Sequence, residues 1–515
     1  MTKSGSERKL DSSIPWSGAH RVKDWLRLHG DLAAFVAVAA VFVIRIVATR
    51  DRYLSPDEAL HVEAASAPSV IDTYENSRFL AHPPLFFLLL HFWLRAGSSE
   101  FFLRLLPMIF GVGFLWFAHR WTGRLFGRTA GLTTLLVLAF SPAFLPLSAE
   151  VRGYSLLLFL SAIALSELEK ALEERSPARM MGFSLLLFLA ILTHYAALFL
   201  VLSLFLYALI RFRGNPSSRR VIRTWAAFQA AAAVLYLFLY FTQVTRLRGS
   251  EAARVMAGWL AAGYYHHDSE NVFGFLTRQT ASLFRYLFGS WFAALLVFVL
   301  AAAGVFSLVL KRRPSALLLV LPYFLGAVAG LMAVYPFGGT RHSAYILPFA
   351  AAAAGASALS VKRPWALATG AALVTALLFG APDWSTPPGS LSRMKAAIDR
   401  LGSIAPRGSL LFTDHRTAAV LTYYFGGYGL SDRRPGLSYR IVRSPVWAFD
   451  SERLGDEVDR LIRIHRLSAG QRFWIVRLGL EDDPTPALSR RLPAAIFSGV
   501  GRFGDILIVE VLLRK

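Results

Sequence analysis

The 515-residue sequence contains no cysteine. This absence excludes disulfide bonds, thiolate zinc sites and a cysteine nucleophile. Acidic residues are also scarce, with 33 Asp and Glu against 55 Lys and Arg, and the formal net charge is +22. Such an excess favours nucleic-acid binding in a soluble protein, but here no basic and aromatic surface or known motif supports it. We therefore expect no nucleic-acid partner.

Apolar residues make up 55% of the chain, and the mean hydropathy is +0.47. They form repeated runs of roughly 17–25 residues, the length that crosses a lipid bilayer as a helix. The chain is therefore predicted to be a mostly α, polytopic membrane protein. Residues 1–30 are polar and basic for too long to resemble a cleaved signal, so we expect a cytoplasmic tail followed by a retained first span at 31–49.

The topology depends on residues 83–96, an apolar stretch of about 14 residues that is too short for a comfortable crossing. It begins with Pro-Pro, which suits the start of a helix lying along the interface. With this assignment, all five basic loops fall on the cytoplasmic side: 119–128, 173–179, 211–223, 311–314 and 362–364. The sequence then predicts eleven spans: 31–49, 100–119, 129–147, 153–170, 180–193, 195–212, 222–243, 289–310, 315–334, 342–360 and 364–381.

The composition changes after residue 382, where β-rich runs alternate with amphipathic segments. The predicted strands are 409–414, 437–442, 472–479 and 505–513, and a helix is expected within 452–467. Alternating strands and helices favour a small α/β domain, and about 130 residues are enough for its own core. We expect three parts: the tail 1–30, a membrane domain 31–382, and an extracytoplasmic domain 383–515.

The first outer loop, residues 50–99, holds charged groups at the edge of the first span. Asp57 and Glu58 follow Ser55-Pro56, a usual helix start in which acids in the first turn are favoured by the dipole. That account also covers His61 as part of the polar face of a surface helix. Charge held near lipid nevertheless marks a functional site.

Further candidates fall on the same face of the membrane under this topology. His82 precedes Pro83-Pro84, and a very short outer loop contains Glu150 and Arg152, which could simply pair with each other. A convergence of acid, base and cation on one face is typical of an active site. The remaining candidates on that face are His194, Tyr195, the run His266-His267-Asp268, Arg341 and His342. Adjacent histidines lack the i, i+4 spacing of a helical metal pair.

Several of these motifs together resemble the GT-C glycosyltransferases. They are a span followed by PDE, an interfacial HPPLFFLLL, the run SEFFLRLLP, and an outer SAEVRGY that enters a helix. Within that group the chain is most similar to the protein mannosyltransferases and aminoarabinose transferases of glycosyltransferase family 39 and its relatives. The resemblance covers residues 31–212 well and the later spans in layout only.

The resemblance implies roles for individual residues. Asp57 stands where the family keeps its first-loop aspartate, a catalytic base or metal ligand, with Glu58 as its usual neighbour. Glu150 takes the second acidic position, so Asp57 and Glu150 are the candidate ligands for a divalent ion (Mg, Mn or Zn), a requirement that the sequence leaves open. The expected substrate-binding residues are His82, Arg152, Tyr154, His194, Tyr195, Arg341 and His342.

The resemblance also implies a reaction. The donor is expected to be a hexose or pentose on a polyprenyl phosphate, and the acceptor an extracytoplasmic glycolipid, polysaccharide or protein, with inversion at the sugar. The expected location is the bacterial inner membrane. A transporter or flippase of polyprenyl lipids or glycolipids is the alternative, which predicts inverted repeats and charges near helix centres. A non-catalytic lipid-binding protein on the same fold is a third possibility.

Overall fold

The fold was described from a computed structural model of the chain. It describes residues 30–47 (except 31, 34 and 46), 51–214 (except 79 and 81), 218–245, 258–359 (except 259), 390–405, 409–424, 439–440, 445–449, 454–478, 485–503 and 506–514.

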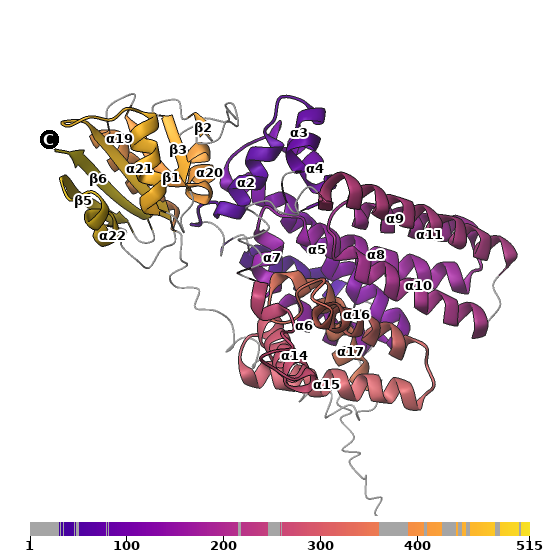
Figure 1. Ribbon diagram of the computed structural model, residues 1–515. Coiled ribbons are helices and arrows are strands. Elements are labelled where there is room, and N and C mark those ends of the chain that lie inside the picture. The colour runs from indigo at the N-terminus through magenta and orange to yellow at the C-terminus, as the bar shows by residue number, and fades with distance from the viewer. Residues whose placement is uncertain are drawn as a thin grey trace, which may run out of the picture.

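Helices dominate the part of the chain before residue 360 (Figure 1). A first apolar helix, Phe35–Arg45, precedes three helices of the outer loop, which are α2 (Pro56–Ala65), α3 (Val70–Ser77) and α4 (Leu85–Leu94). The bundle then continues through α5 (Glu100–Phe126), α6 (Arg128–Ala139), α7 (Phe144–Ala149), α8 (Tyr154–Glu173), α9 (Pro177–Ile191), α10 (Ala197–Gly214), α11 (Arg219–Leu239), η1 (Tyr240–Val244), η2 (Ala261–Gly263), α14 (Val272–Phe288), α15 (Trp291–Leu310), α16 (Ser315–Leu331), η3 (Arg341–Ile346), α17 (Leu347–Ala356) and η4 (Ser357–Leu359).

Three described helices are long and apolar enough to cross a membrane by themselves: Glu100–Phe126, Arg219–Val244 and Trp291–Leu310. Several others are apolar but shorter, such as Pro177–Ile191 and Ser315–Leu331. The predicted short helix at 83–96 is present as α4. The eleven-span count stays a prediction, and its last span, 364–381, lies outside the described residues.

The predicted span 129–147 is broken into α6 and α7. The break leaves backbone carbonyl groups without their helical partners, which is costly inside a membrane unless other groups bind them. The buried guanidinium of Arg45 donates to the carbonyl oxygens of Ala139 and Phe144 at 3.2 and 3.4 Å. Ser141 Oγ accepts from the Phe144 N–H and donates to the Leu287 carbonyl. Side chains from other parts of the bundle and from the break itself therefore bind the backbone groups at the break between α6 and α7.

The predicted span 342–360 also differs from the structure. It forms η3, then α17 of only ten residues, then η4, and every residue of α17 is buried. Its sequence, LPFAAAAAGA, is rich in alanine, so neighbouring helices approach it closely. This segment is an internal helix of the bundle and has no lipid-facing side.

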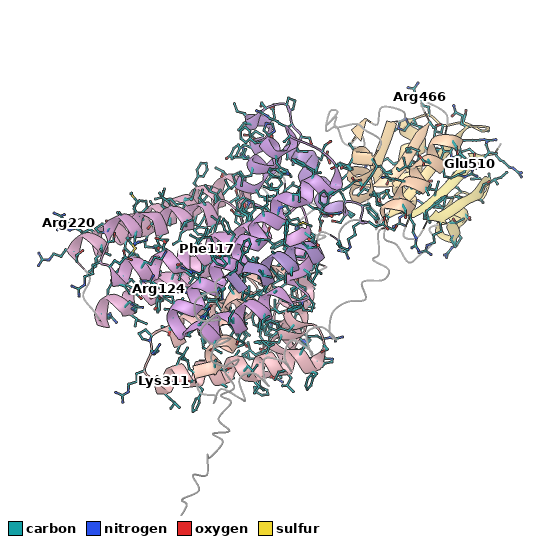
Figure 2. All side chains as sticks on the ribbon, turned by 180° about the vertical axis from the view of Figure 1, so that it is seen from behind. Phe117, Arg124, Arg220, Lys311, Arg466 and Glu510 are labelled. Carbon is teal, nitrogen blue, oxygen red and sulfur yellow. The ribbon has the colours of Figure 1, made fainter. Side chains whose placement is uncertain are left out.

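Three of the five basic loops lie at one end of the helical bundle (Figure 2), and the loop 362–364 lies outside the described residues. Figure 2 shows Arg124, Arg220 and Lys311 at the end that lies away from the β-sheet. Arg313 donates to the Leu125 carbonyl oxygen at 3.2 Å, so two of these loops touch. This common end agrees with the charge argument made from the sequence, while the side of the membrane it faces stays a prediction.

The last 126 residues contain a six-stranded mixed sheet with the order β2-β3-β1-β4-β6-β5. Strand β1 pairs in parallel with β3 and β4, and the other pairs are antiparallel. The predicted strands are present as β1, β2, β4 and β6, whereas β3 and β5 were not predicted. The elements are α19 (Leu391–Ile404), β1 (Leu410–Asp414), α20 (His415–Tyr424), β2 (Tyr439–Arg440), β3 (Pro445–Phe449), α21 (Leu454–Ile464), β4 (Arg472–Leu478), α22 (Thr485–Arg491), β5 (Ala495–Phe503) and β6 (Ile506–Leu513).

The sheet part is joined to the outer loop of the bundle. Figure 1 shows α20 beside α2, and one apolar core runs from the bundle into α19, α20 and one face of the sheet. A second, smaller core around Phe412, Phe473 and Val511 fills the other face. The C-terminal part therefore packs, through α20, on the helix that carries Asp57 and Glu58 (Figure 1).

Close helix packing at Gly304 of α15 gives a test of the bundle. A Cβ atom there would overlap the Ala353 carbonyl oxygen of α17, so we expect Gly304→Ala to destabilise the protein by about 1–3 kcal/mol. Gly182 of α9 has nothing within 4 Å of the same position, and Gly182→Ala should be neutral or stabilising by up to about 1 kcal/mol. Thermal unfolding in detergent measures both, and equal stability of the two variants would contradict the packing of α15 on α17.

Candidate active site

Helix α2 brings the first two candidate acids to the end of the bundle that contacts the C-terminal part. Ser55 caps the helix: its Oγ accepts from the Glu58 N–H at 3.3 Å, and the Ser55 N–H donates to Glu58 Oε2 at 2.8 Å. This reciprocal pair is a capping box. The helix start predicted from Ser-Pro-Asp-Glu is confirmed. It places Asp57 next to Glu58, whose backbone and side chain are both hydrogen-bonded to Ser55.

Glu58 forms a buried ion pair with Arg104 of α5, and each side chain is only 3% exposed. Arg104 donates from Nε to Glu58 Oε1 at 3.1 Å and from Nη2 to Oε2 at 3.2 Å. The Val151 N–H also donates to Glu58 Oε1, at 3.2 Å. One carboxylate thus joins α2, α5 and the loop before α8, and it places Arg152 next to Asp57.

Asp57 lies between two guanidinium groups that come from distant parts of the chain. Arg152 Nη1 donates to Asp57 Oδ2 at 3.0 Å, and Arg341 Nη2 donates to the same oxygen at 2.6 Å. The Asp57 side chain is 27% exposed, Arg341 35% and Arg152 6%. The ion pair of Arg152 is with Asp57, and not with Glu150, the partner that the alternative structural account would give it. Two cations therefore share one partly exposed carboxylate.

Histidines surround this group on its buried side. Arg152 Nη2 donates to His82 Nε2 at 3.1 Å, and since a guanidinium can only donate, His82 carries its proton on Nδ1. The His82 ring lies 5.4 Å from His61 and 5.0 Å from His194, measured between centroids. His61 Nδ1 donates to the Asp57 carbonyl oxygen at 2.7 Å. His61 is buried, so the alternative account that places it on the polar face of a surface helix does not hold.

These histidines are neutral at physiological pH. Burial, followed by the Arg152 charge, lowers the pKa of His61 to about 3. Burial and then the neighbouring His342 lower the pKa of His194 to about 3, and burial and then Arg341 lower that of His342 to about 4. The pKa of His82 is also well below its usual range, mainly because of burial. The site therefore holds its positive charge on arginine and not on histidine.

The other expected residues divide into two groups. The Arg152 guanidinium carbon lies 5.1 Å from the centroid of the Tyr154 ring. The centroid of the same ring lies 4.9 Å from that of the His194 ring. Glu150 is close enough to interact with Asp57 and both arginines, and burial, followed by the Glu58 charge, raises its pKa. Tyr195, in contrast, donates its hydroxyl to Gln243 of η1 at 2.8 Å and is not part of the arginine group.

A metal ion does not fit the arrangement expected for Asp57 and Glu150. Asp57 is already bound by two cations, and a third would be repelled by them. Within the described ranges, no three His, Asp or Glu side chains are grouped so that they could hold a metal ion. His267 and Asp268 pair at 2.9 Å, but both are more than 80% exposed.

Arg104 is the site residue that sequence reasoning missed. It stands in SEFFLRLLP, a motif that was used for the resemblance, but no role was given to the arginine. A single charge inside an apolar helical run is costly in a membrane protein unless it has a buried partner, and this is the signal that identifies it. Its partner, Glu58, is 46 residues away, so no local pattern could name the pair.

The chain was compared with known proteins. Residues 81–242 match the family model of the dolichyl-phosphate-mannose-protein mannosyltransferases. No curated protein sequence shows a significant match. The family match confirms the predicted relationship to the protein mannosyltransferases, and with it the prediction of a multi-pass membrane glycosyltransferase of the GT-C type.

Solved structures agree on the fold. ArnT from Cupriavidus metallidurans bound to undecaprenyl phosphate has a TM-score of 0.58 at 15% identity, covering 94% of this chain and 98% of ArnT. The oligosaccharyltransferase AglB from Archaeoglobus fulgidus, in complex with an inhibitory peptide and a dolichol-phosphate, has a TM-score of 0.55 at 12% identity. The match covers 94% of this chain and 74% of AglB. A complex of the Archaeoglobus fulgidus oligosaccharyltransferase with Zn and sulfate has a TM-score of 0.55 at 12% identity. The match covers 87% of this chain and 69% of that one.

The buried Glu58–Arg104 pair predicts a pH dependence. Burial alone would raise the pKa of Glu58, but Arg104 and the N–H donors of Ser55 and Val151 outweigh it and lower the pKa below its ordinary 4.5. The pair therefore stabilises the protein above about pH 4.5, and this stability is lost as the pH falls through the lowered pKa. Glu58→Gln should lose about 3–5 kcal/mol at pH 7 and show a weaker acid dependence.

Thermal unfolding between pH 3 and 7 measures this effect. The exposed Glu75, which pairs with Arg78 at 2.6 Å, supplies the control, because Glu75→Gln should change stability by less than about 1 kcal/mol. If Glu58→Gln and wild type lose stability in parallel as the pH falls, Glu58 is not the group responsible.

Proposed function

We propose that this glycosyltransferase moves a sugar from a polyprenyl-phosphate donor to a hydroxyl group of an extracytoplasmic acceptor. The observation that supports this most is the Asp57 carboxylate of α2, which is held by Arg152 and Arg341. That arrangement joins a proton acceptor with two phosphate-binding groups. The acceptor is a glycolipid, a polysaccharide or a protein, and the membrane is the bacterial inner membrane.

In the proposed reaction, the acceptor oxygen attacks the anomeric carbon of the sugar in a single displacement. A bond forms between that oxygen and the carbon, the bond from the carbon to the phosphate oxygen breaks, and its electron pair stays on the phosphate. Asp57 accepts the proton of the attacking hydroxyl, acting as a general base. A single displacement inverts the configuration at the sugar.

Because of the two arginines, the basicity of Asp57 depends on whether the donor is bound. Without donor, Arg152 and Arg341 both bind Asp57 Oδ2 and stabilise the carboxylate as an anion, which weakens it as a base. A donor phosphate competes for the same guanidinium groups, since arginine binds phosphate through paired hydrogen bonds. Asp57 thereby becomes a stronger base when the donor is in place.

The same groups stabilise the leaving phosphate. Negative charge develops on it as the sugar bond breaks, and preorganised donors in a water-poor site stabilise such charge most strongly. Arg152 is kept in place by His82 and by the Tyr154 ring, so only its contact with Asp57 is exchanged for the phosphate. His194 accepts the Ala196 N–H at Nδ1, which leaves its buried Nε2–H directed at no partner in the described part of the chain and able to donate to the phosphate or sugar.

Asp57→Asn tests the proposed base. The substitution keeps the size of the side chain but removes its charge, so we expect transfer to fall by at least about 100-fold, the usual contribution of a general base. Labelled sugar transfer from a panel of polyprenyl-phosphate donors measures it, and Asp72→Asn on the exposed face of α3 is the control. Full transfer by a folded Asp57→Asn protein would assign the proton to another group, with Glu150 next.

The positive charge around Asp57 also predicts the effect of removing metal. Because two guanidinium groups occupy the position beside the carboxylate, we expect transfer to stay within about twofold after treatment with a chelator, since phosphate charge is balanced by arginine. Residual metal in the protein should be measured by mass spectrometry. Loss of transfer that returns on addition of Mg²⁺, Mn²⁺ or Zn²⁺ would contradict this expectation and restore a metal to the site.

A further inference from the structure

Helix α20 of the C-terminal part contacts the outer loop just before the helix that carries Asp57. The Leu54 N–H donates to the Tyr424 hydroxyl oxygen at 2.9 Å. Leu54 is completely buried, so water does not replace this acceptor if it is lost. Figure 1 shows α20 lying against α2, with the strands of the sheet on the side of α20 that faces away from α2.

With the bond to Tyr424, both polar groups of the peptide unit between Tyr53 and Leu54 are hydrogen-bonded. Arg104 Nη2 donates to the Tyr53 carbonyl oxygen at 2.8 Å, and that carbonyl belongs to the same peptide group as the Leu54 N–H. The bundle therefore holds one side of this peptide plane and the C-terminal part holds the other. The next residue is Ser55, which caps α2, and Asp57 lies in the first turn of that helix.

Other contacts bring the two parts together at the same loop. Leu391 N–H donates to the Asp51 carbonyl oxygen at 3.1 Å, and Ser390 Oγ donates to the Asp51 carboxylate at 3.0 Å. Tyr423, the neighbour of Tyr424, donates its hydroxyl to the Ser98 carbonyl oxygen at 2.6 Å. Of these bonds, the one from Leu54 to Tyr424 lies nearest in sequence to the cap of α2.

We propose that Tyr424 is a positioning residue for the transfer reaction, and that the C-terminal part sets the orientation of Asp57 through it. This inference rests on the proposed function for its kinetic test. Loss of the Tyr424 hydroxyl leaves a buried N–H without an acceptor, so the peptide group between Tyr53 and Leu54 turns or moves. The start of α2 then shifts, and Asp57 moves relative to Arg152 and Arg341, which lie on other elements.

Tyr424→Phe tests the proposal, with Tyr423→Phe as the matched control. Both variants lose one hydroxyl from adjacent residues of α20, but only the first removes the acceptor for Leu54. We expect Tyr424→Phe to lower kcat about tenfold with the KM for donor changed less than about twofold, because misplacing a base slows the chemical step more than binding. Tyr423→Phe should keep kcat within about twofold.

Hydrogen–deuterium exchange gives a second measurement that does not depend on activity. The amides of residues 51–60 should exchange faster in Tyr424→Phe than in wild type and remain unchanged in Tyr423→Phe. Unchanged exchange together with an unchanged kcat in Tyr424→Phe would overturn the proposal, as would an equal kcat loss in both variants. Absence of transfer by wild type with every donor would count against the proposed function alone, since the exchange result still decides the role of Tyr424.

Discussion

The buried ion pair between Glu58 and Arg104 is the interaction on which the active end of the molecule depends. Two opposite charges have been taken out of water, and such a pair is tolerated only when further hydrogen bonds satisfy both groups. Here the carboxylate also accepts from the Ser55 and Val151 N–H groups, and the guanidinium also donates to the carbonyl oxygens of residues 52 and 53. The cost of burial is offset by a network that fixes three segments at one point.

That network explains why the neighbouring residues can carry chemistry. Asp57 follows directly from the capped start of α2, and Arg152 follows directly from Val151, so the bonds of Glu58 to the Ser55 and Val151 N–H groups bring the Asp57 carboxylate and the Arg152 guanidinium together through the backbone. The capping box itself is made by Ser55 and Glu58. Neutral, buried histidines fill the inner side, which keeps the charge of the site on one carboxylate and two guanidinium groups.

The bundle and the sheet are also connected through this point. A C-terminal domain packed only on the outer surface would be free to move relative to the active end. Here the Tyr424 hydroxyl and the Arg104 guanidinium bind the two sides of one peptide group, so the position of the sheet and the position of α2 are linked. The C-terminal part is thus coupled to the start of the helix that carries Asp57.

The sequence by itself determined the features that depend on local composition. Apolar runs and basic loops predicted a helical membrane bundle with its basic loops at one end, Ser55-Pro56-Asp57-Glu58 predicted a capped helix, and the combined motifs predicted the relationship to the mannosyltransferases. Most strands of the sheet were readable from β-rich runs. Strand β5 was not, because Gly499 and Gly501 interrupt its pattern where the register shifts.

Only the tertiary structure decided which charges meet. Asp57 and Arg341 are 284 residues apart in the sequence, and Leu54 and Tyr424 are 370 apart, so no local pattern can pair them. From the sequence, a pair of Glu150 with Arg152 and a surface position for His61 were open alternatives, whereas in the packed bundle Arg152 pairs with Asp57 and His61 is buried. A short-range pattern records which residues lie on one helix, but the free energy of burying a charge depends on partners that only the packed bundle supplies.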